Sequence, residues 1–249
     1  MQHGVVLLPG IIAPAAIRYG ALIERLPGAR ASMHDLAVYD GDTPPAGYSI
    51  SAELDALDRF ADAVQLDRFH VFGHSGGGAV ALAYAAQRGQ RLVSVAVDEP
   101  ASDFTADGDA VYGWPEFDSA LGLPPDQAMA AFMRLQVAPD VALPAPPEGP
   151  PPPWMVKRPA GIAAFATALR SHRIDEDQYR RFAKPVYFSR GSRTHPRWAA
   201  MQQRLAEVFP DFTGDVFEGL HHLNPAHQAE PDRAAAILST FWERAENVR

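Results

Sequence analysis

Short apolar runs alternate with longer amphipathic segments along this chain. Six runs rich in branched or aromatic residues are predicted as strands, at 5–8, 31–36, 69–72, 92–97, 186–189 and 213–218. Between them, residues 51–64 place apolar side chains at helical spacing and acidic ones on the opposite face. This alternation predicts an α/β fold, with a mostly parallel sheet of about six strands flanked by helices.

Three further helices are expected around the sheet. Residues 77–87 are almost all small or apolar, which suits a helix buried against central strands, whereas 197–209 and 231–243 are amphipathic. The last of these has Pro231 early and Asp232 in its first turn, which favours a helix start.

Residues 101–183 interrupt the alternation. Helical patterns at 126–137 and 161–172 flank a proline-rich stretch, 144–153, which is expected to be a stiff extended connector. We therefore expect one core, formed by 1–100 and 184–249, with a helical lid insertion over 101–183.

Composition narrows the class of protein. The 249 residues carry a formal charge of −8, and the 22 Lys and Arg are scattered, so a nucleic-acid partner is not expected. Without cysteine there is no disulfide and no thiolate nucleophile. No stretch approaches the roughly 18 to 20 apolar residues of a membrane span, and the first apolar run is too short for a signal peptide. A soluble, cytoplasmic protein is expected.

A glycine-rich turn joins the strand at 69–72 to the helix at 77–87. It reads Gly73-His74-Ser75-Gly76-Gly77, the strand–turn–helix context in which Gly-x-Ser-x-Gly exposes a serine nucleophile at a helix N-terminus. The alternative is a glycine turn without chemistry or a phosphate-binding loop, but no lysine follows and the next basic residue is Arg88. Ser75 is the candidate nucleophile.

With this motif the chain resembles the α/β-hydrolase superfamily, over residues 5–100 and 184–243 in order. The resemblance implies a serine hydrolase of esterase type and a sheet whose first two strands are missing here. It also implies an oxyanion hole formed by the N–H of Gly76 and the N–H of Ile11. Pro9-Gly10 stands where many relatives have His-Gly.

Two adjacent histidines, His221 and His222, follow the last predicted strand, where the superfamily keeps its general base. The phrase His-Leu-Asn-Pro at 222–225 fits the pattern of relatives, which favours His222. His227, His195 and His74 are expected to be structural or surface residues, although His74 flanks Ser75 and is a candidate substrate contact.

The third member of the triad departs from the usual pattern. Most relatives place an Asp after the strand matching 186–189, but residues 190–196 contain no carboxylate. Some relatives, including certain haloalkane dehalogenases, place the acid after the strand that follows the nucleophile helix. Glu99 matches that position, with Asp98 as second choice. A third possibility is a degraded triad, in which Ser192 or Thr194 merely hydrogen-bonds the histidine.

A serine at position 75 argues against the dehalogenase and epoxide hydrolase branches, which carry Asp there. Aromatic residues of the insertion offer an apolar pocket, with Trp114, Phe132 and Trp154 as candidate substrate contacts, although such residues also form helical cores. The leading hypothesis is a hydrolase of a carboxylic ester, lactone or thioester of a small to medium apolar molecule. The alternatives are a lyase, acyltransferase or C–C hydrolase on the same fold, or a low-turnover binding protein.

No cofactor is expected. His221, His222 and His227 lack carboxylates at ligand spacing, so no metal site is predicted, and no Gly-x-Gly-x-x-Gly follows a strand. The mechanism needs only a small-molecule substrate and water.

Overall fold

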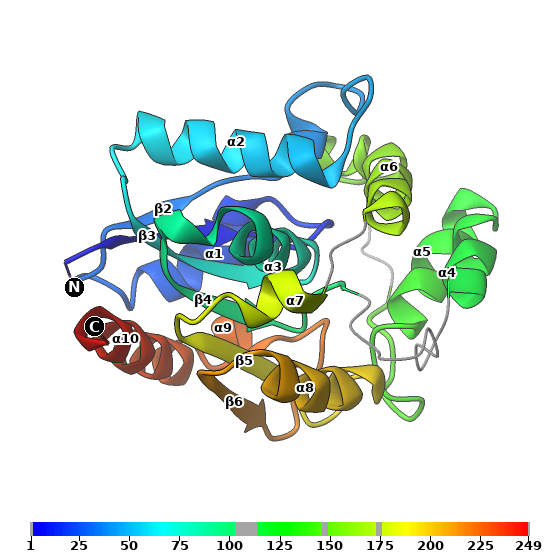
Figure 1. Ribbon diagram of the computed structural model, residues 1–249. Coiled ribbons are helices and arrows are strands. Elements are labelled where there is room, and N and C mark those ends of the chain that lie inside the picture. The colour runs from blue at the N-terminus through cyan, green and yellow to red at the C-terminus, as the bar shows by residue number, and fades with distance from the viewer. Residues whose placement is uncertain (1, 103–113, 146–148, 173–175, 249) are drawn as a thin grey trace.

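A single parallel sheet organises the part of the chain that the structure describes (Figure 1). The protein is represented by a computed structural model, which describes residues 2–102, 114–145, 149–172 and 176–248. The strand order is β2-β1-β3-β4-β5-β6, and every neighbouring pair is parallel. The strands are β1 (Gly4–Leu8), β2 (Ala31–Met33), β3 (Phe69–His74), β4 (Leu92–Asp98), β5 (Val186–Gly191) and β6 (Phe212–Phe217). The predicted α/β sheet of six strands is confirmed.

Alternate residues of each strand pack into two separate cores, because side chains of a strand point to opposite faces. Val5 and Leu7 of β1 join one core, and Val6 and Leu8 join the other. Helices α1 (Ala15–Ile23), α9 (Ala226–Ala229) and α10 (Pro231–Asn247) cover the first face. Helices α2 (Ile50–Ala63), α3 (Gly76–Arg88) and α8 (Arg197–Val208) cover the second. The sheet is therefore buried on both sides, as its apolar strands require.

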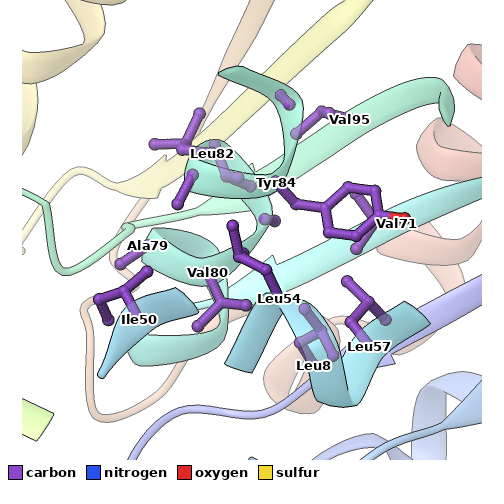
Figure 2. Close-up of a cluster of buried hydrophobic side chains, with 14 of the residues drawn as sticks. Leu8, Ile50, Leu54, Leu57, Val71, Ala79, Val80, Leu82, Tyr84 and Val95 are labelled. Atoms are coloured by element: carbon purple, nitrogen blue, oxygen red, sulfur yellow. The ribbon is translucent and has the colours of Figure 1, made fainter. Parts of the chain in front are cut away.

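Helices α2 and α3 build the larger core together. Figure 2 shows Leu54 and Leu57 of α2 beside Val80 of α3, next to Val71 of β3. Helix α2 begins after Ser49, whose hydroxyl accepts the N–H of Ala52 at 3.2 Å as an N-cap. This packing fixes α3, and with it the turn that precedes α3.

Strand β2 is shorter than the predicted run at 31–36. It ends at Met33, and the chain turns into a short 3-10 helix, η1 (Ala37–Tyr39). The buried carboxylate of Glu53 holds this turn by accepting the N–H groups of Ala37 and Val38 at 2.9 and 3.0 Å. Backbone groups satisfied by a side chain no longer need a strand partner.

The connection from β4 to β5 carries several helices. They are α4 (Trp114–Leu121), α5 (Pro125–Arg134), η3 (Pro153–Met155), α6 (Arg158–Ser171) and α7 (Glu176–Arg180), and η2 (Gly89–Arg91) precedes β4. Figure 1 shows α4, α5 and α6 gathered at one end of the sheet. Helix α6 packs on η1 and α2, and α7 packs on α3 and α8. Part of the segment predicted as a lid thus rests directly on the core, and its division from the core stays a prediction.

Among the described residues, no helix combines the length and the apolar character needed to cross a bilayer.

Candidate active site

Ser75 occupies the sharp turn between β3 and α3. Its backbone has φ 51° and ψ −117°, a conformation that side-chain-bearing residues rarely adopt. A Cβ on Gly73 would lie 2.3 Å from the carbonyl oxygen of Gly77, and one on Gly77 would lie 2.3 Å from that of Leu8. The turn therefore requires both glycines, and it places the Ser75 hydroxyl at the N-terminus of α3.

His222 lies in the loop after β6 and reaches Ser75. Its Nε2 is 3.1 Å from the Ser75 Oγ, a distance at which the hydroxyl donates to the ring. The ring stacks on Trp198, with centroids 4.6 Å apart and planes 15° from parallel. The Trp198 indole in turn donates to the carbonyl oxygen of Pro100 at 3.2 Å, so α8 holds the imidazole in position. No sequence motif indicated Trp198.

Glu99 joins the same hydrogen-bonded chain. Its Oε2 accepts the His222 Nδ1–H at 2.7 Å, and the carboxylate is almost fully buried just beyond the end of β4. The loop after β5, which lacks a carboxylate, supplies donors instead. The Gly191 N–H donates to Glu99 Oε1 at 2.7 Å, and the Thr194 hydroxyl lies 2.8 Å from Oε2. The structure thus brings Ser75, His222 and Glu99 together.

The other candidates for these positions lie elsewhere. The neighbouring His221 is half-buried, and within the described chain its ring nitrogen Nδ1 has no hydrogen-bond partner. Thr194 contacts Glu99 and the carbonyl oxygen of Gln136, and Ser192 accepts the N–H of Gly219 at 2.9 Å. Neither hydroxyl takes the place of the acid beside His222.

Burial governs the protonation of the His222–Glu99 pair. Desolvation lowers the pKa of His222 well below its usual range, and the nearby His74 and Arg197 act in the same direction. Burial and the charge of Asp98 raise the pKa of Glu99, while the Gly191 N–H and Thr194 hydroxyl oppose that rise. At neutral pH the imidazole is unprotonated at Nε2, the form that can accept a proton from serine.

Asp98, the second choice for the acid, belongs to a separate buried network. Its Oδ2 accepts the Nδ1–H groups of His74 and His227, both at 3.1 Å, and its Oδ1 accepts the Ser189 hydroxyl at 2.8 Å. His74 is 1% exposed. This network links His74, the residue before Ser75, to β4 and α9. Contact of His74 with a substrate stays a prediction.

This network predicts a loss of stability in mild acid. Burial lowers the pKa of His74 to about 3 and also lowers that of His227, while the two imidazoles hold the pKa of Asp98 below its usual range. The unfolded chain binds protons on these histidines below about pH 6.5, whereas the folded chain does not, so the free energy of unfolding should fall as the pH drops from about 6.5 toward 3. Urea unfolding at a series of pH values measures this slope.

The matched control is the double variant His74→Gln and His227→Gln, which should show a smaller slope over the same interval. Because the raised pKa of Glu99 contributes with the opposite sign, the comparison with this variant isolates the histidine contribution. Equal slopes in the two proteins would contradict the prediction.

Two backbone N–H groups beside Ser75 are free to bind an anion. A Cβ on Gly76 would lie 3.4 Å from the nitrogen of Ile11, so the two amides are close neighbours. Within the described residues, neither N–H donates to a carbonyl or a side chain. The Ile11 carbonyl accepts the Tyr39 hydroxyl at 2.7 Å, which fixes the orientation of that peptide. This is the arrangement expected of an oxyanion hole.

The three predicted substrate contacts in the β4–β5 connection differ in their burial and in their neighbours. Phe132 is buried, meets Phe117 edge-on at 5.6 Å, and belongs to the larger hydrophobic core. Trp154 is half-buried near Arg158, and the side chain of Trp114 lies outside the described residues. Phe165, which was not among the candidates, brings its ring to 3.4 Å from a Cβ on Gly76.

Two groups of described residues have the composition of a metal site. His74, Asp98 and His227 form the hydrogen-bonded network already described. The second group, His3, His70 and Glu246, lies where the start of the chain meets α10, and Glu246 accepts the N–H groups of Gln2 and His3 at 2.6 and 2.8 Å. Neither group includes Ser75 or His222, so neither supplies a group to the candidate site.

The fold and the hydrogen-bonded chain from Ser75 to Glu99 match the arrangement of the α/β-hydrolase class. The chain belongs to the alpha/beta hydrolase family, whose model matches residues 5–237. It is 37% identical over 107 residues to the N-formylmaleamate deformylase of Pseudomonas putida, an alignment covering 40% of this chain and 38% of that protein. The matched part thus spans well under half of the deformylase.

Solved structures share the whole fold. MenH from S. aureus is 16% identical with a TM-score of 0.66, over 98% of this chain and 95% of MenH. The meta-cleavage product hydrolase CumD is 15% identical with a TM-score of 0.67, over 98% and 92%. The proline iminopeptidase of Mycobacterium smegmatis is 21% identical with a TM-score of 0.64, over 98% and 90%. At these identities the likeness concerns the fold.

Proposed function

We propose that this protein is a serine hydrolase that cleaves an ester, lactone or thioester of a small molecule through an acyl-enzyme. The observation that carries the proposal is the continuous chain Ser75–His222–Glu99, with distances of 3.1 and 2.7 Å. A serine alone is a weak nucleophile, and a neutral imidazole within hydrogen-bond reach is the standard means of activating it.

The proposed acylation follows from these contacts. Ser75 Oγ attacks the substrate carbonyl carbon while its proton passes to His222 Nε2. The N–H groups of Ile11 and Gly76 bind the resulting oxyanion, and Glu99 stabilises the charged imidazole through the Nδ1–H bond. When the tetrahedral intermediate collapses, the C–O bond to the leaving group, or the C–S bond in a thioester, breaks, and His222 donates its proton to the departing alcohol or thiol.

Deacylation uses the same groups in reverse order. His222 removes a proton from water, which attacks the acyl carbon, and the C–O bond to Ser75 breaks as the serine recovers its proton. Each proton is returned within the cycle, so the chemistry consumes only substrate and water.

A second candidate is hydrolysis of an acyl C–N bond. The relative at 37% identity is named a deformylase of N-formylmaleamate, and an N-formyl group is cleaved at such a bond. The same hydrogen-bonded residues, Ser75, His222 and Glu99 (the relay), can serve both reactions, because the two tetrahedral intermediates differ only in the leaving atom. The protonated His222 would then be needed to protonate a leaving nitrogen, which departs less readily than an aryloxide.

A substrate panel tests these assignments. We expect turnover of short-chain nitrophenyl esters, and comparison with an N-formyl amide and a vinylogous diketone shows which bond is cleaved. Turnover of the diketone alone would assign the relay to C–C hydrolysis. Thermal stabilisation by these compounds without any product would indicate a binding protein and overturn the proposal.

A further inference from the structure

Helix α6 places Phe165 over the candidate active site and Arg158 over the neighbouring Tyr39. Phe165 touches the position of Gly76, and Arg158 lies seven residues earlier, about two helical turns away on the same face. Both are at least nine-tenths buried. Arg158 and Phe165 therefore lie on the same face of α6, which packs on the core beside the loop that contains Ile11.

The Arg158 guanidinium stacks on the Tyr39 ring. Its carbon Cζ is 3.7 Å from the centroid of that ring and 5.4 Å from the centroid of the Trp154 ring. The Tyr39 hydroxyl donates to the carbonyl oxygen of Ile11, the residue whose N–H faces Gly76. One aromatic ring thus separates this cation from the loop that forms the candidate oxyanion hole.

Arg158 lacks an acidic partner within the described chain. The residue is 3% exposed, and its Nε is buried without a hydrogen-bond partner. Glu53, whose charge reaches Tyr39, is already occupied by the N–H groups of Ala37 and Val38 and by the Tyr48 hydroxyl. A buried cation is unfavourable unless an anion compensates it, so this position favours a ligand with negative charge.

We propose that Arg158 binds a free carboxylate of the substrate, so that the substrate class is an acyl compound carrying a second, ionised carboxyl group. The proposal rests on the serine-hydrolase function proposed above. The guanidinium lies over the Tyr39 ring, and its planar pair of N–H groups suits two-point recognition of a carboxylate. The carboxylate is bound but not transformed, and the reacting carbonyl stays at Ser75.

The test compares matched pairs of esters. One set consists of para-nitrophenyl monoesters of succinic, glutaric and adipic acid, with a second set carrying the carboxylate on the aryl leaving group. Each has a neutral isostere in which an isopropyl group replaces the carboxylate. We expect a kcat/KM ratio of acid to isostere well above one for the best-fitting pair, and a fall of about 100-fold in that ratio in Arg158→Met.

Two further variants make the result specific. Arg158→Lys keeps the charge but loses the planar fork, so it should recover part of the ratio. Lys157→Gln is the matched control, because Lys157 neighbours Arg158 but donates to the carbonyl oxygens of Tyr39 and Gly41. It should leave the ratio as in the wild type. A ratio near one in the wild type, or an unchanged ratio in Arg158→Met, would overturn the proposal.

A fluorophosphonate probe separates this outcome from failure of the proposed function. Labelling of Ser75 in Arg158→Met shows that the variant keeps a folded relay. If the wild type is neither labelled nor active on any ester, the hydrolase proposal fails, and calorimetric titration with glutarate then tests Arg158 directly. Glutarate binding that is lost in Arg158→Met but kept in Lys157→Gln would still support the carboxylate site, and absence of binding to the wild type would contradict it.

Discussion

Replacement of Ser75 by alanine is expected to lower kcat for an aryl ester about a million-fold, the size of effect that removal of a triad nucleophile has in a serine protease. The expectation follows from the position of the hydroxyl, which lies 3.1 Å from His222 Nε2 at the N-terminus of α3. Without it, water would have to attack the substrate directly, with help only from the oxyanion donors. Discontinuous assays, quenched at long times and run at high enzyme concentration, can measure the residual rate.

Ser192→Ala is the matched control for this loss. Ser192 lies in the loop after β5 and accepts the Gly219 N–H at 2.9 Å, outside the relay. Its replacement should change kcat by less than about threefold, because the chemistry does not use it. Retention of full activity in Ser75→Ala would show that the ester is cleaved at another site.

Replacement of Glu99 by glutamine is expected to lower kcat/KM about ten-thousand-fold, comparable to the equivalent acid-to-amide change in a serine protease. The glutamine amide can donate to His222 Nδ1, which forces the ring proton onto Nε2. That nitrogen then cannot accept the proton of Ser75. Circular dichroism and the thermal midpoint establish that the variant is folded, and the loss should appear mainly in kcat.

Asp98→Asn is the informative companion to Glu99→Gln. Asp98 precedes Glu99 in the sequence but binds His74 and His227. Its replacement should therefore mainly lower the free energy of unfolding and should change kcat little. The opposite ranking, with a large loss of kcat in Asp98→Asn and a small one in Glu99→Gln, would transfer the role of the acid to Asp98.

The parts of the site that follow from local sequence were the most predictable. The turn at Ser75 is determined by glycines two positions to either side, and His222 follows a strand that its own pattern indicates. The sheet was predictable for the same reason, since each strand is a short apolar run bounded by a turn. Strand β2 ended well before its predicted end at residue 36, and Glu53, a residue of a later helix, binds the backbone of the turn that follows it.

Contacts between segments far apart in the chain were harder to predict from the sequence. Glu99 was chosen from the sequence because residues 190–196 contain no carboxylate. The structure shows what this loop contributes instead: Gly191 and Thr194 donate hydrogen bonds to Glu99. Trp198 and Arg158 have no motif, and their contacts with His222 and Tyr39 exist only after the chain has folded. Aromatic stacking of this kind depends on helix placement, which sequence patterns do not specify.

The relay from Ser75 to Glu99 is tested most directly by the mass of the protein during turnover. The enzyme is mixed with excess nitrophenyl ester, quenched in acid after a few turnovers, and digested for peptide mapping. The proposed mechanism predicts a peptide that is heavier by one acyl group, modified at Ser75, and absent in Ser75→Ala. Steady release of product with no acyl group on Ser75 at any quench time, under conditions in which deacylation is slow, would contradict it.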